Sequence, residues 1–360
     1  MKQLLLVSGV LALVACTRVE DERVAPAARK TVESMESMQS MQSMRAPSGI
    51  EKLVVDLAPC RLEGYQITST CPAMETLTAE LRHPGTAHEL SLALGGKLLV
   101  HGAPAVRLEA ATLLGSDAAS RDAVVDAARR EPDLHVREAM IRILAADGAR
   151  YPRVGAFLLD SAQHGSREIR TQALAALTLP ANRQLPGAAD RVLAMAERDP
   201  DPALRQAACR VGGALGTALW IPFYERVTAS SDEPELYTAC MEGVVSMFLE
   251  PPRNEAAYRL FLRRITESPS KAPWQVMSVF CYTHEWKQPP AWFDTMEVKT
   301  AMIAVITDRA ASWQAREAAI ESMVGLGASR DELKALEAGY SPKDNSDRLV
   351  LAKLDSALAE

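Results

Sequence analysis

The chain has 360 residues, of which 48% are hydrophobic and only 5% aromatic, and its formal net charge is -6 at pH 7. An acidic chain without a basic block argues against nucleic acid as a partner. Scarce aromatics together with abundant Ala and Leu favour small-residue helix packing over a β sandwich. The length suits one large elongated domain or two compact ones.

Residues 1–15 have the features of a cleaved secretory signal peptide. Lys2 supplies a positive charge, a short apolar run extends from Leu4 to Val14, and the small residue Ala15 follows. This run is shorter than the roughly 18 consecutive apolar residues that a membrane-spanning helix needs, and no other stretch of the chain approaches that length. The sequence therefore predicts export.

The end of this segment, Leu13-Val14-Ala15-Cys16, resembles the lipobox of bacterial lipoproteins. The resemblance implies that Cys16 is acylated and becomes the mature N-terminus. It also implies outer-membrane sorting, facing the periplasm, because Thr17 rather than Asp follows the cysteine. The alternative is an ordinary signal peptide with a cysteine there by chance.

Residues 16–50 are predicted to be a flexible tether, because they contain too few large apolar residues to repay the entropy of ordering. Within it, ESMESMQSMQSM places four methionines at three-residue steps: Met35, Met38, Met41 and Met44. Thioethers are soft ligands, so one hypothesis is Cu(I) binding. The preferred interpretation is a linker, since no His or Cys lies beside the tract and such steps drift around a helix by about 60° each.

From residue 73 to residue 358 the chain repeats itself. Segments beginning with an apolar or small residue and Arg, followed closely by Ala, recur: VRLEAATLLG, VREAMIRILAADG, IRTQALAALTL, LRQAACRVGGALG and, after two longer steps, AREAAIESMVGLG. A second amphipathic segment follows each, for example PRVGAFLLDSA. Two helices per 30 to 40 residues predict an all-α fold, an α-solenoid of about eight helix pairs.

The pattern resembles HEAT-like repeats, especially the short bacterial kind with an acid three residues before the repeat start. Asp133, Asp201 and Glu233 occupy that position. Asp133 and either Asp199 or Asp201 are predicted to cap the helices that follow them. The glycines Gly212 and Gly213, followed by Gly216, are predicted to weaken and end the helix that contains them.

The repeated arginines suggest two roles, binding an anionic ligand or bridging to an acid of the adjacent unit. They are Arg107, Arg137, Arg170, Arg205 and Arg316. We favour the bridging role, because each lies in the first helical turn, one residue after a position expected to be buried.

Five cysteines remain besides Cys16. Cys60 and Cys71 bracket a short loop in the predicted N-terminal cap, residues 51–72, and an oxidising compartment favours a disulfide between them over two buried thiols. A Cys240–Cys281 disulfide is a second hypothesis. The odd number leaves at least one thiol unpaired within the chain, and Cys209 lies in an apolar helical segment.

No constellation of residues predicts catalysis. The six histidines include no H-E-x-x-H pair, and the chain contains no G-x-S-x-G elbow, P-loop or C-x-x-C spacing. We therefore expect no enzyme activity, no catalytic residues and no cofactor. An enzyme with a site formed by distant residues is the weakest alternative.

Most aromatic residues fall between Trp220 and Trp313. Trp274, Trp286, Trp292 and Phe293 are candidates for docking a protein or peptide partner, because aromatics are enriched at binding hot spots. The alternative is that a longer, irregular unit fills its wider gaps with large side chains. The leading hypothesis is thus a lipid-anchored envelope scaffold that binds other proteins, and the second is a Cu(I)-handling lipoprotein.

Overall fold

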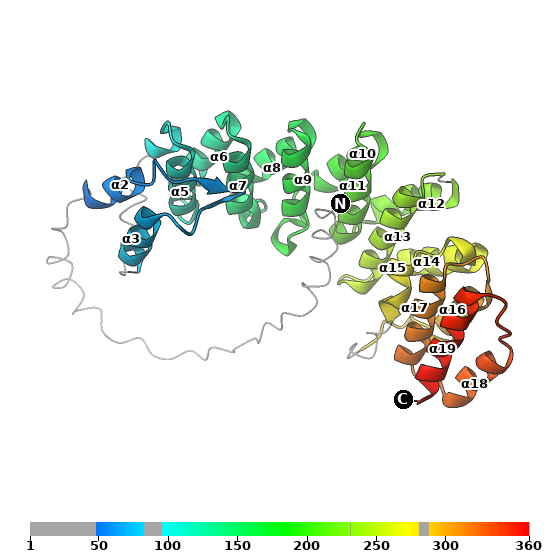
Figure 1. Cartoon of the computed structure of the whole chain (residues 1–360). Coiled ribbons are helices and arrows are strands. Elements are labelled where there is room, and N and C mark those ends of the chain that lie inside the picture. Colours follow the sequence, from blue (N-terminus) through cyan, green and yellow to red (C-terminus); the bar gives the residue numbers. More distant parts are fainter. Residues whose placement is uncertain (1–47, 83–95, 231, 281–287, 360) are drawn as a thin grey trace, which may run out of the picture. The chain divides into compact units, whose positions relative to one another are not determined.

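The structure is a computed structural model that describes residues 48–82, 96–230, 232–280 and 288–359 (Figure 1). The predicted signal peptide, Cys16, the methionine tract, Cys281 and Trp286 lie outside these ranges. Within them, no helix combines the length and the apolar character that crossing a lipid bilayer requires.

The described N-terminal residues form a helix, a small hairpin and a second helix. Helix α2 (Ser48–Val55) leads to strands β1 (Leu62–Glu63) and β2 (Gln66–Ile67), and helix α3 (Pro72–Leu81) follows. The strands pair antiparallel, with Leu62 opposite Ile67. Gly64 turns the hairpin with a φ of 61°, which glycine adopts without steric cost. The sequence did not predict this hairpin.

The rest of the described chain is a succession of helices in two layers, connected by short 3₁₀ segments (Figure 1). The helices that begin with the repeated Arg pattern, or replace it, form the first layer. They are α5 (Pro104–Gly115), α7 (Leu134–Leu144), α9 (Arg167–Leu177), α11 (Pro202–Leu215), α13 (Pro234–Leu249), α15 (Trp274–Met277), α17 (Trp313–Gly325) and α19 (Asn345–Ala359). Each of these packs on the next one along the chain.

The helices between them form the second layer. They are α6 (Arg121–Arg130), α8 (Pro152–His164), α10 (Ala188–Arg198), α12 (Ile221–Ser230), α14 (Glu255–Glu267), α16 (Thr295–Thr307) and α18 (Arg330–Ala338). The 3₁₀ segments are η1 (Leu98–Val100), η2 (Ala145–Asp147), η3 (Pro180–Asn182), η4 (Ala218–Trp220) and η5 (Pro269–Lys271). This succession of stacked helix pairs confirms the predicted all-α solenoid.

The repeats share their apolar interior with their neighbours. In α7, Val136, Met140 and Leu144 lie four residues apart on one helical stripe, and none of them is exposed. The buried residues from Val54 to Leu354 form one continuous hydrophobic cluster. A single pair therefore has no separate core, and its stability depends on the pairs stacked against it.

Local signals set the helix ends as expected. The Asp133 carboxylate accepts hydrogen bonds from the backbone N–H groups of His135 and Val136 at the start of α7, and Asp201 caps α11. Proline occupies the first turn of α11, where the missing N–H costs nothing. Gly216 ends α11 in the left-handed conformation, with a φ of 67°.

Two other glycines of α11 serve packing, which the sequence did not predict. A Cβ added at Gly213 would lie 2.6 Å from the Cα of Gly243 on α13, so the two helix backbones touch there. A Cβ at Gly212 would meet the buried ring of Trp220. Glycine in a helix interior costs roughly 1 kcal/mol relative to alanine, and here it permits close approach of α11 and α13.

Candidate functional site

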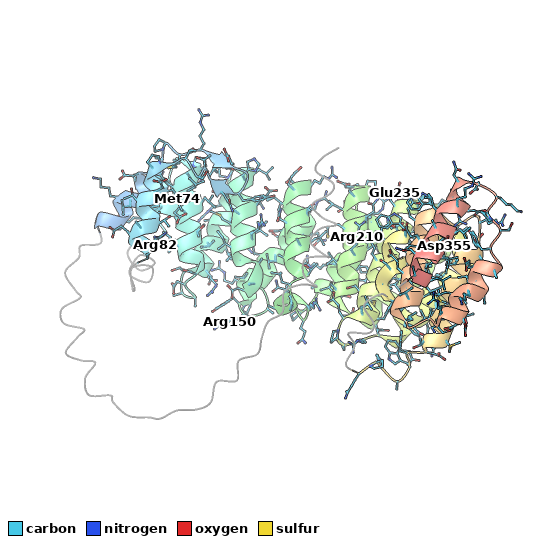
Figure 2. All side chains as sticks on the ribbon, turned by 60° about the horizontal axis from the view of Figure 1, so that its bottom comes forward. Met74, Arg82, Arg150, Arg210, Glu235 and Asp355 are labelled. Atoms are coloured by element: carbon cyan, nitrogen blue, oxygen red, sulfur yellow. A yellow bond between two sulfur atoms is a disulfide. The ribbon has the colours of Figure 1, made fainter. Side chains whose placement is uncertain are left out.

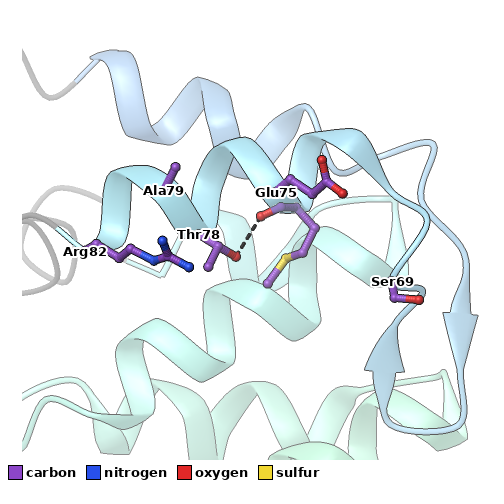
Figure 3. A pocket seen from close by; sticks show the side chains of 6 residues that line it. Ser69, Glu75, Thr78, Ala79 and Arg82 are labelled. Carbon is purple, nitrogen blue, oxygen red and sulfur yellow. Dashed lines mark hydrogen bonds between the residues drawn. The ribbon is translucent and has the colours of Figure 1, made fainter.

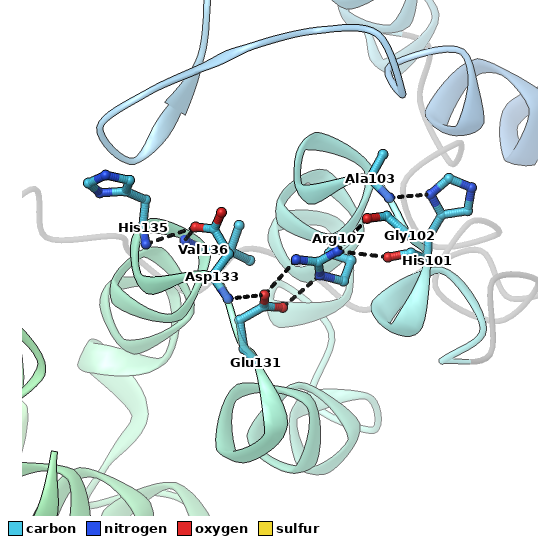
Figure 4. Close-up of polar contacts among 8 residues, drawn as sticks. All are labelled: His101, Gly102, Ala103, Arg107, Glu131, Asp133, His135 and Val136. Carbon is cyan, nitrogen blue, oxygen red and sulfur yellow. Dashed lines mark hydrogen bonds and ion pairs between the residues drawn. The ribbon is translucent and has the colours of Figure 1, made fainter. Parts of the chain in front are cut away.

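The first repeated arginine, Arg107 of α5, binds an acid of the following unit (Figure 4). Its Nε and Nη2 donate to the two carboxylate oxygens of Glu131 at 2.8 and 2.6 Å. Its Nη1 donates to the carbonyls of His101 and Gly102. The Glu131 carboxylate also accepts from the backbone N–H of Asp133 at 2.9 Å. We call this arrangement a rung: an Arg of one unit and an acid of the next, with that acid bound by the N–H of the following cap residue.

Burial makes this rung strong. The Arg107 side chain is 9% exposed and that of Glu131 is 1% exposed, so water competes little for either. The hydrogen bonds that Arg107 donates to Glu131 raise the pKa of the guanidinium, and bidentate pairing is the strongest geometry that Arg and a carboxylate form. The pair joins α5 to the start of α7 and is satisfied within the protein.

Three other arginines of the series also bind an acid of the next unit. Arg170 pairs with Asp199, whose other oxygen accepts from the N–H of Asp201 at 2.9 Å, as in the first rung. Arg205 pairs with Glu233 at 2.6 Å. In the last units, Arg316 pairs with Asp347 at 2.8 Å. These contacts confirm the bridging interpretation over a ligand-binding stripe for four of the five arginines.

The sequence did not identify the correct acids at two of these rungs. Asp133 and Asp201, the acids three residues before each repeat start, cap helices, while Glu131 and Asp199 bind the arginines. The available signal was the acid-Pro-acid pattern, EPD at 131–133 and DPD at 199–201, in which the first acid is the rung.

A second series of ion pairs follows the second layer. Basic side chains reach acids of neighbouring second-layer helices: Arg153 to Asp126, Arg226 to Glu197, Arg263 to Glu225 and Arg259 to Glu297. Both side chains of most of these pairs are exposed, so solvent screens their attraction and each contributes little to stability. They account for much of the surface charge without a ligand.

One position of the first layer stays at the surface in seven of the eight first-layer helices, all except α15. It lies five residues after each repeated Arg or its replacement, and it is exposed or half-buried at every member: Thr112, Arg142, Ala175, Arg210, Glu242, Glu321 and Lys353. We call this set the first-layer row. Arg142 stacks on the ring of Tyr65 from the N-terminal hairpin, 4.4 Å from its centroid. Arg210 pairs with Glu242, and Lys353 with Glu321.

The row therefore presents one side chain from each first-layer helix except α15. Its basic members Arg142 and Arg210 precede the acidic members Glu242 and Glu321 in the chain. Figure 2 shows the side chains along the stack and labels Arg210, a member of the row. It also labels Arg150 and Glu235, which are exposed but do not belong to the row.

The four aromatic candidates have different surroundings. Trp274, at the start of α15, is 52% exposed. Trp292 and Phe293 are half-buried, with ring centroids 5.0 and 5.8 Å from that of Tyr258. Trp286 lies outside the described residues. Trp292 and Phe293 thus fill space between helices, while Trp274 is accessible to a partner.

Tyr258 is the centre of that aromatic group. It has no exposed surface, and its hydroxyl lies 3.3 Å from both the backbone nitrogen and the oxygen of Asp294. Burial raises its pKa to about 12, so the hydroxyl stays protonated. Substitution of Trp292 would disturb this buried group.

The N-terminal pocket lies along α3 (Figure 3). Its volume is about 280 Å³, and its lining is Ser69, Met74, Glu75, Thr78, Ala79 and Arg82. The Thr78 hydroxyl donates to the Met74 carbonyl at 2.8 Å. This lining provides no nucleophile paired with a base, which covalent catalysis would need.

A similar pocket lies between α14 and α16. Arg259, Arg263, Glu267 and Glu297 supply its charges. Arg259 is engaged by Glu297, and Arg263 by Glu225, so the basic groups serve helix contacts.

Metal ligands do not cluster in the part of the chain that the structure describes, where no group of three or more His, Cys, Asp or Glu side chains could hold an ion. The methionine tract lies outside that part, so the Cu(I) hypothesis for Met35, Met38, Met41 and Met44 keeps its status as a prediction.

Two pairs of cysteines lie at disulfide distance. Cys60 and Cys71 close the hairpin loop, with Cα atoms 5.7 Å apart. Cys240 pairs with Cys209, their Cα atoms 4.8 Å apart, so the Cys240–Cys281 hypothesis is wrong. The reason is helix packing: the contact between Gly213 and Gly243 brings α11 and α13 together one helical turn away from these cysteines.

No protein-family model matches this chain, and no curated protein matches it either. Among solved structures it is similar to Kap121p at 13% identity and a TM-score of 0.46. It is also similar to Kap121p bound to the SUMO protease Ulp1p, at 13% identity and a TM-score of 0.45. In both cases the match covers 90% of this chain and 39% of the other, so this chain spans well under half of that protein's length.

The fold and the surface therefore define the class of the protein. It is an α-solenoid of HEAT-like helix pairs in which Arg–acid ion pairs join several neighbouring units.

Proposed function

We propose that this protein is a lipid-anchored scaffold or adaptor of the bacterial cell envelope that binds other proteins through its solenoid surface, without catalysis. The single observation that carries the binding role is the first-layer row. Its members lie exposed or half-buried at the same position of seven first-layer helices, so they form a repeated recognition surface. Stacked repeats use such extended surfaces for binding.

Exposed Trp274 supports the same role. A large aromatic side chain that is 52% exposed is a candidate anchor for a partner, since Trp is among the residues that dominate binding energy. It lies at the start of α15, a first-layer helix of only 4 residues. The unit that contains α15 thus presents an exposed tryptophan, Trp274, as a possible contact for a partner.

The anchor in this proposal rests on the lipobox-like Leu13-Val14-Ala15-Cys16 and the tether after it. Lipidation of Cys16 would hold the protein at the outer membrane, facing the periplasm, while the tether separates the solenoid from the lipid. A chain carrying more than one acyl group binds membranes far more firmly than one with a single chain.

Site-specific photo-crosslinking tests the binding role. A photoreactive residue replaces Ala175, an exposed member of the row, and the matched control carries it at Ala229, exposed on the second-layer helix α12. We expect discrete crosslinked proteins from position 175 in native envelopes and none from position 229. Equal crosslinking at both positions, or none at 175, would contradict the proposed surface.

A second experiment separates the anchor from the surface. Cys16→Ser is expected to abolish incorporation of labelled palmitate and to release the protein from the membrane fraction, with its far-UV circular dichroism unchanged. Trp274→Ala is expected to weaken partner capture without changing the melting temperature. Membrane retention of the Cys16→Ser variant would contradict lipidation but leave the binding surface untouched.

A further inference from the structure

The remaining arginine of the series, Arg137 of α7, differs from the other four in its hydrogen-bond partners. Its guanidinium makes no hydrogen bond or ion pair with the residues that the structure describes. Its Nε is buried without a partner, as are those of Arg170 and Arg316, but the latter two bind an acid through Nη1. Arg107 and Arg205 also donate to the carbonyl six residues before them, and Arg137 makes no such contact to Glu131. The Arg137 guanidinium thus lacks both the acid and the carbonyl that accept hydrogen bonds from the equivalent arginines.

The sequence of the next unit explains the difference. The rung acid lies six residues before the Arg of the following repeat: Glu131 before Arg137, and Asp199 before Arg205. The same position before Arg170 is His164. An imidazole is shorter than a Glu side chain and brings no negative charge when neutral, so it cannot replace the bidentate carboxylate.

A second donor lacks its acceptor at the same rung. In the flanking rungs the acid also binds the backbone N–H of the helix-capping residue, at Asp133 and at Asp201. The equivalent residue is Ser166, which caps α9 through its hydroxyl. Its own N–H forms no hydrogen bond with the described residues, and the residue is exposed to solvent. Replacement of one acid by His164 thus leaves two donors, a guanidinium and a backbone N–H, that equivalent rungs direct at one carboxylate.

Neighbouring charged groups are engaged elsewhere. His164 lies 4.0 Å from Asp160, and Glu138 lies 3.6 Å from His135. Arg167 binds Asp201 at 3.1 Å. Among the described residues, neither these acids nor Glu168 in the first turn of α9 forms an ion pair with Arg137.

We propose that Arg137 and the N–H of Ser166 bind a carboxylate supplied from outside the chain, the side chain of an Asp or Glu of a partner protein. The partner's acid takes the place that Glu131 and Asp199 take in the flanking rungs. This inference rests on the proposed protein-binding function and adds the chemistry of the partner: an acidic residue that reaches the junction of α7 and α9.

The test fills the rung from within the chain. His164→Glu restores an acid, and the matched control is His164→Gln, which adds a side chain of similar length without charge. We expect His164→Glu to raise the melting temperature of the full-length mature protein by about 2 °C relative to His164→Gln. No difference between the two variants would overturn the rung geometry.

Binding is measured with acetyl-Glu-Glu-Glu-amide as the probe at low salt. The reporter is the Nε–Hε NMR signal of Arg137, assigned by its absence in Arg137→Lys. We expect the probe to shift this signal in the wild type and in His164→Gln but not in His164→Glu, where the carboxylate is already supplied. Acetyl-Gln-Gln-Gln-amide is the control peptide and should shift nothing.

A signal that does not respond to the acidic peptide, or that responds equally in His164→Glu, would overturn the proposal. Crosslinking at Ala175 reports on the proposed function by a separate route. Partners captured at Ala175 without any response of Arg137 would remove this inference alone, whereas a response of Arg137 without captured partners would remove the proposed function of the row.

Discussion

Arg316 of α17 and Asp347 of α19 form a buried ion pair, with 2.8 Å between Nη1 and Oδ1 and each side chain only 2% exposed. The hydroxyl of Tyr340 lies 3.0 Å from the same carboxylate oxygen, and the N–H of Lys343 donates to the other. The last two first-layer helices are thus joined by a carboxylate whose oxygens are all satisfied.

Breaking this pair should be costly. We expect Asp347→Asn to lower the free energy of unfolding by about 3 kcal/mol, because it leaves the Arg316 charge buried without compensation. Urea unfolding followed by circular dichroism measures the loss. The control is Asp355→Asn, an exposed acid of the same helix, which should change stability little. Equal effects of the two substitutions would show that the pair with Arg316 contributes no more to stability than an exposed acid does.

The same pair predicts a dependence on pH. Hydrogen bonds from Arg316 and Lys343 hold the pKa of Asp347 well below its usual range. Its contribution to stability is therefore complete above the unfolded pKa of about 4, and it is lost as pH falls toward the folded pKa. The difference in unfolding free energy between wild type and Asp347→Asn should therefore shrink as the pH falls from about 5 to about 2. A difference independent of pH would contradict the assignment.

Glu109 of α5 should behave in the opposite way. Its side chain is buried, and burial raises the pKa of the carboxyl. Below the unfolded pKa such a carboxyl is protonated in both the folded and the unfolded state, so it does not reduce the free energy of unfolding. As the pH rises through the folded pKa, the buried group must ionise and the folded state is destabilised. We expect Glu109→Gln to raise the melting temperature at pH 7 and to have little effect at about pH 3.

The control for this prediction is Glu63→Gln, which removes an exposed carboxylate of the hairpin. It should leave the melting temperature unchanged at both pH values. A Glu109→Gln variant that is less stable than wild type at pH 7 would mean that the carboxylate forms a favourable interaction.

The disulfide assignment is testable by peptide mapping. Digestion and mass spectrometry of the protein under non-reducing conditions should recover peptides linked through Cys209 and Cys240, with Cys60 linked to Cys71. Linking residues 31 apart in sequence is expected to contribute about 3–4 kcal/mol in the chain-entropy model, so Cys209→Ala should be strongly destabilised. A Cys240–Cys281 peptide would contradict the structure.

The backbone contact between α11 and α13 predicts that a larger residue at Gly213 destabilises the protein. Gly213→Ala should lose about 1–3 kcal/mol of stability, because its Cβ has no space beside Gly243. Gly339→Ala is the control, since a Cβ there meets no atom closer than 3.5 Å. Thermal unfolding measures both. A neutral Gly213→Ala would show that the helices separate at little cost.

Features with local causes were predictable from the sequence. Asp133 and Asp201 cap their helices because a carboxylate at that position reaches the N–H groups of the next turn whatever the rest of the fold does. The repeat pattern predicted the paired helices because each pair must bury the same apolar stripe against its neighbours. The bridging role of the arginines followed from their position just after a buried residue.

Contacts between segments that are distant in the sequence were harder to predict from the sequence. The aromatic group looked uniform in the sequence, but contact with Tyr258 makes Trp292 and Phe293 part of the packing and leaves Trp274 exposed. The pairing of Cys240 depended on which helices touch, and Gly213, predicted only to weaken α11, allows its contact with α13.

The sequence by itself determined the all-α repeat architecture and the helix caps, because these depend on periodicity and on bonds within one helical turn. The tertiary structure alone decided which acid meets which arginine, which cysteines pair and which aromatic side chain stays exposed. Each of these depends on the stacking of one unit on the next, where a change of one residue, as at His164, alters the partners of a side chain in the preceding repeat.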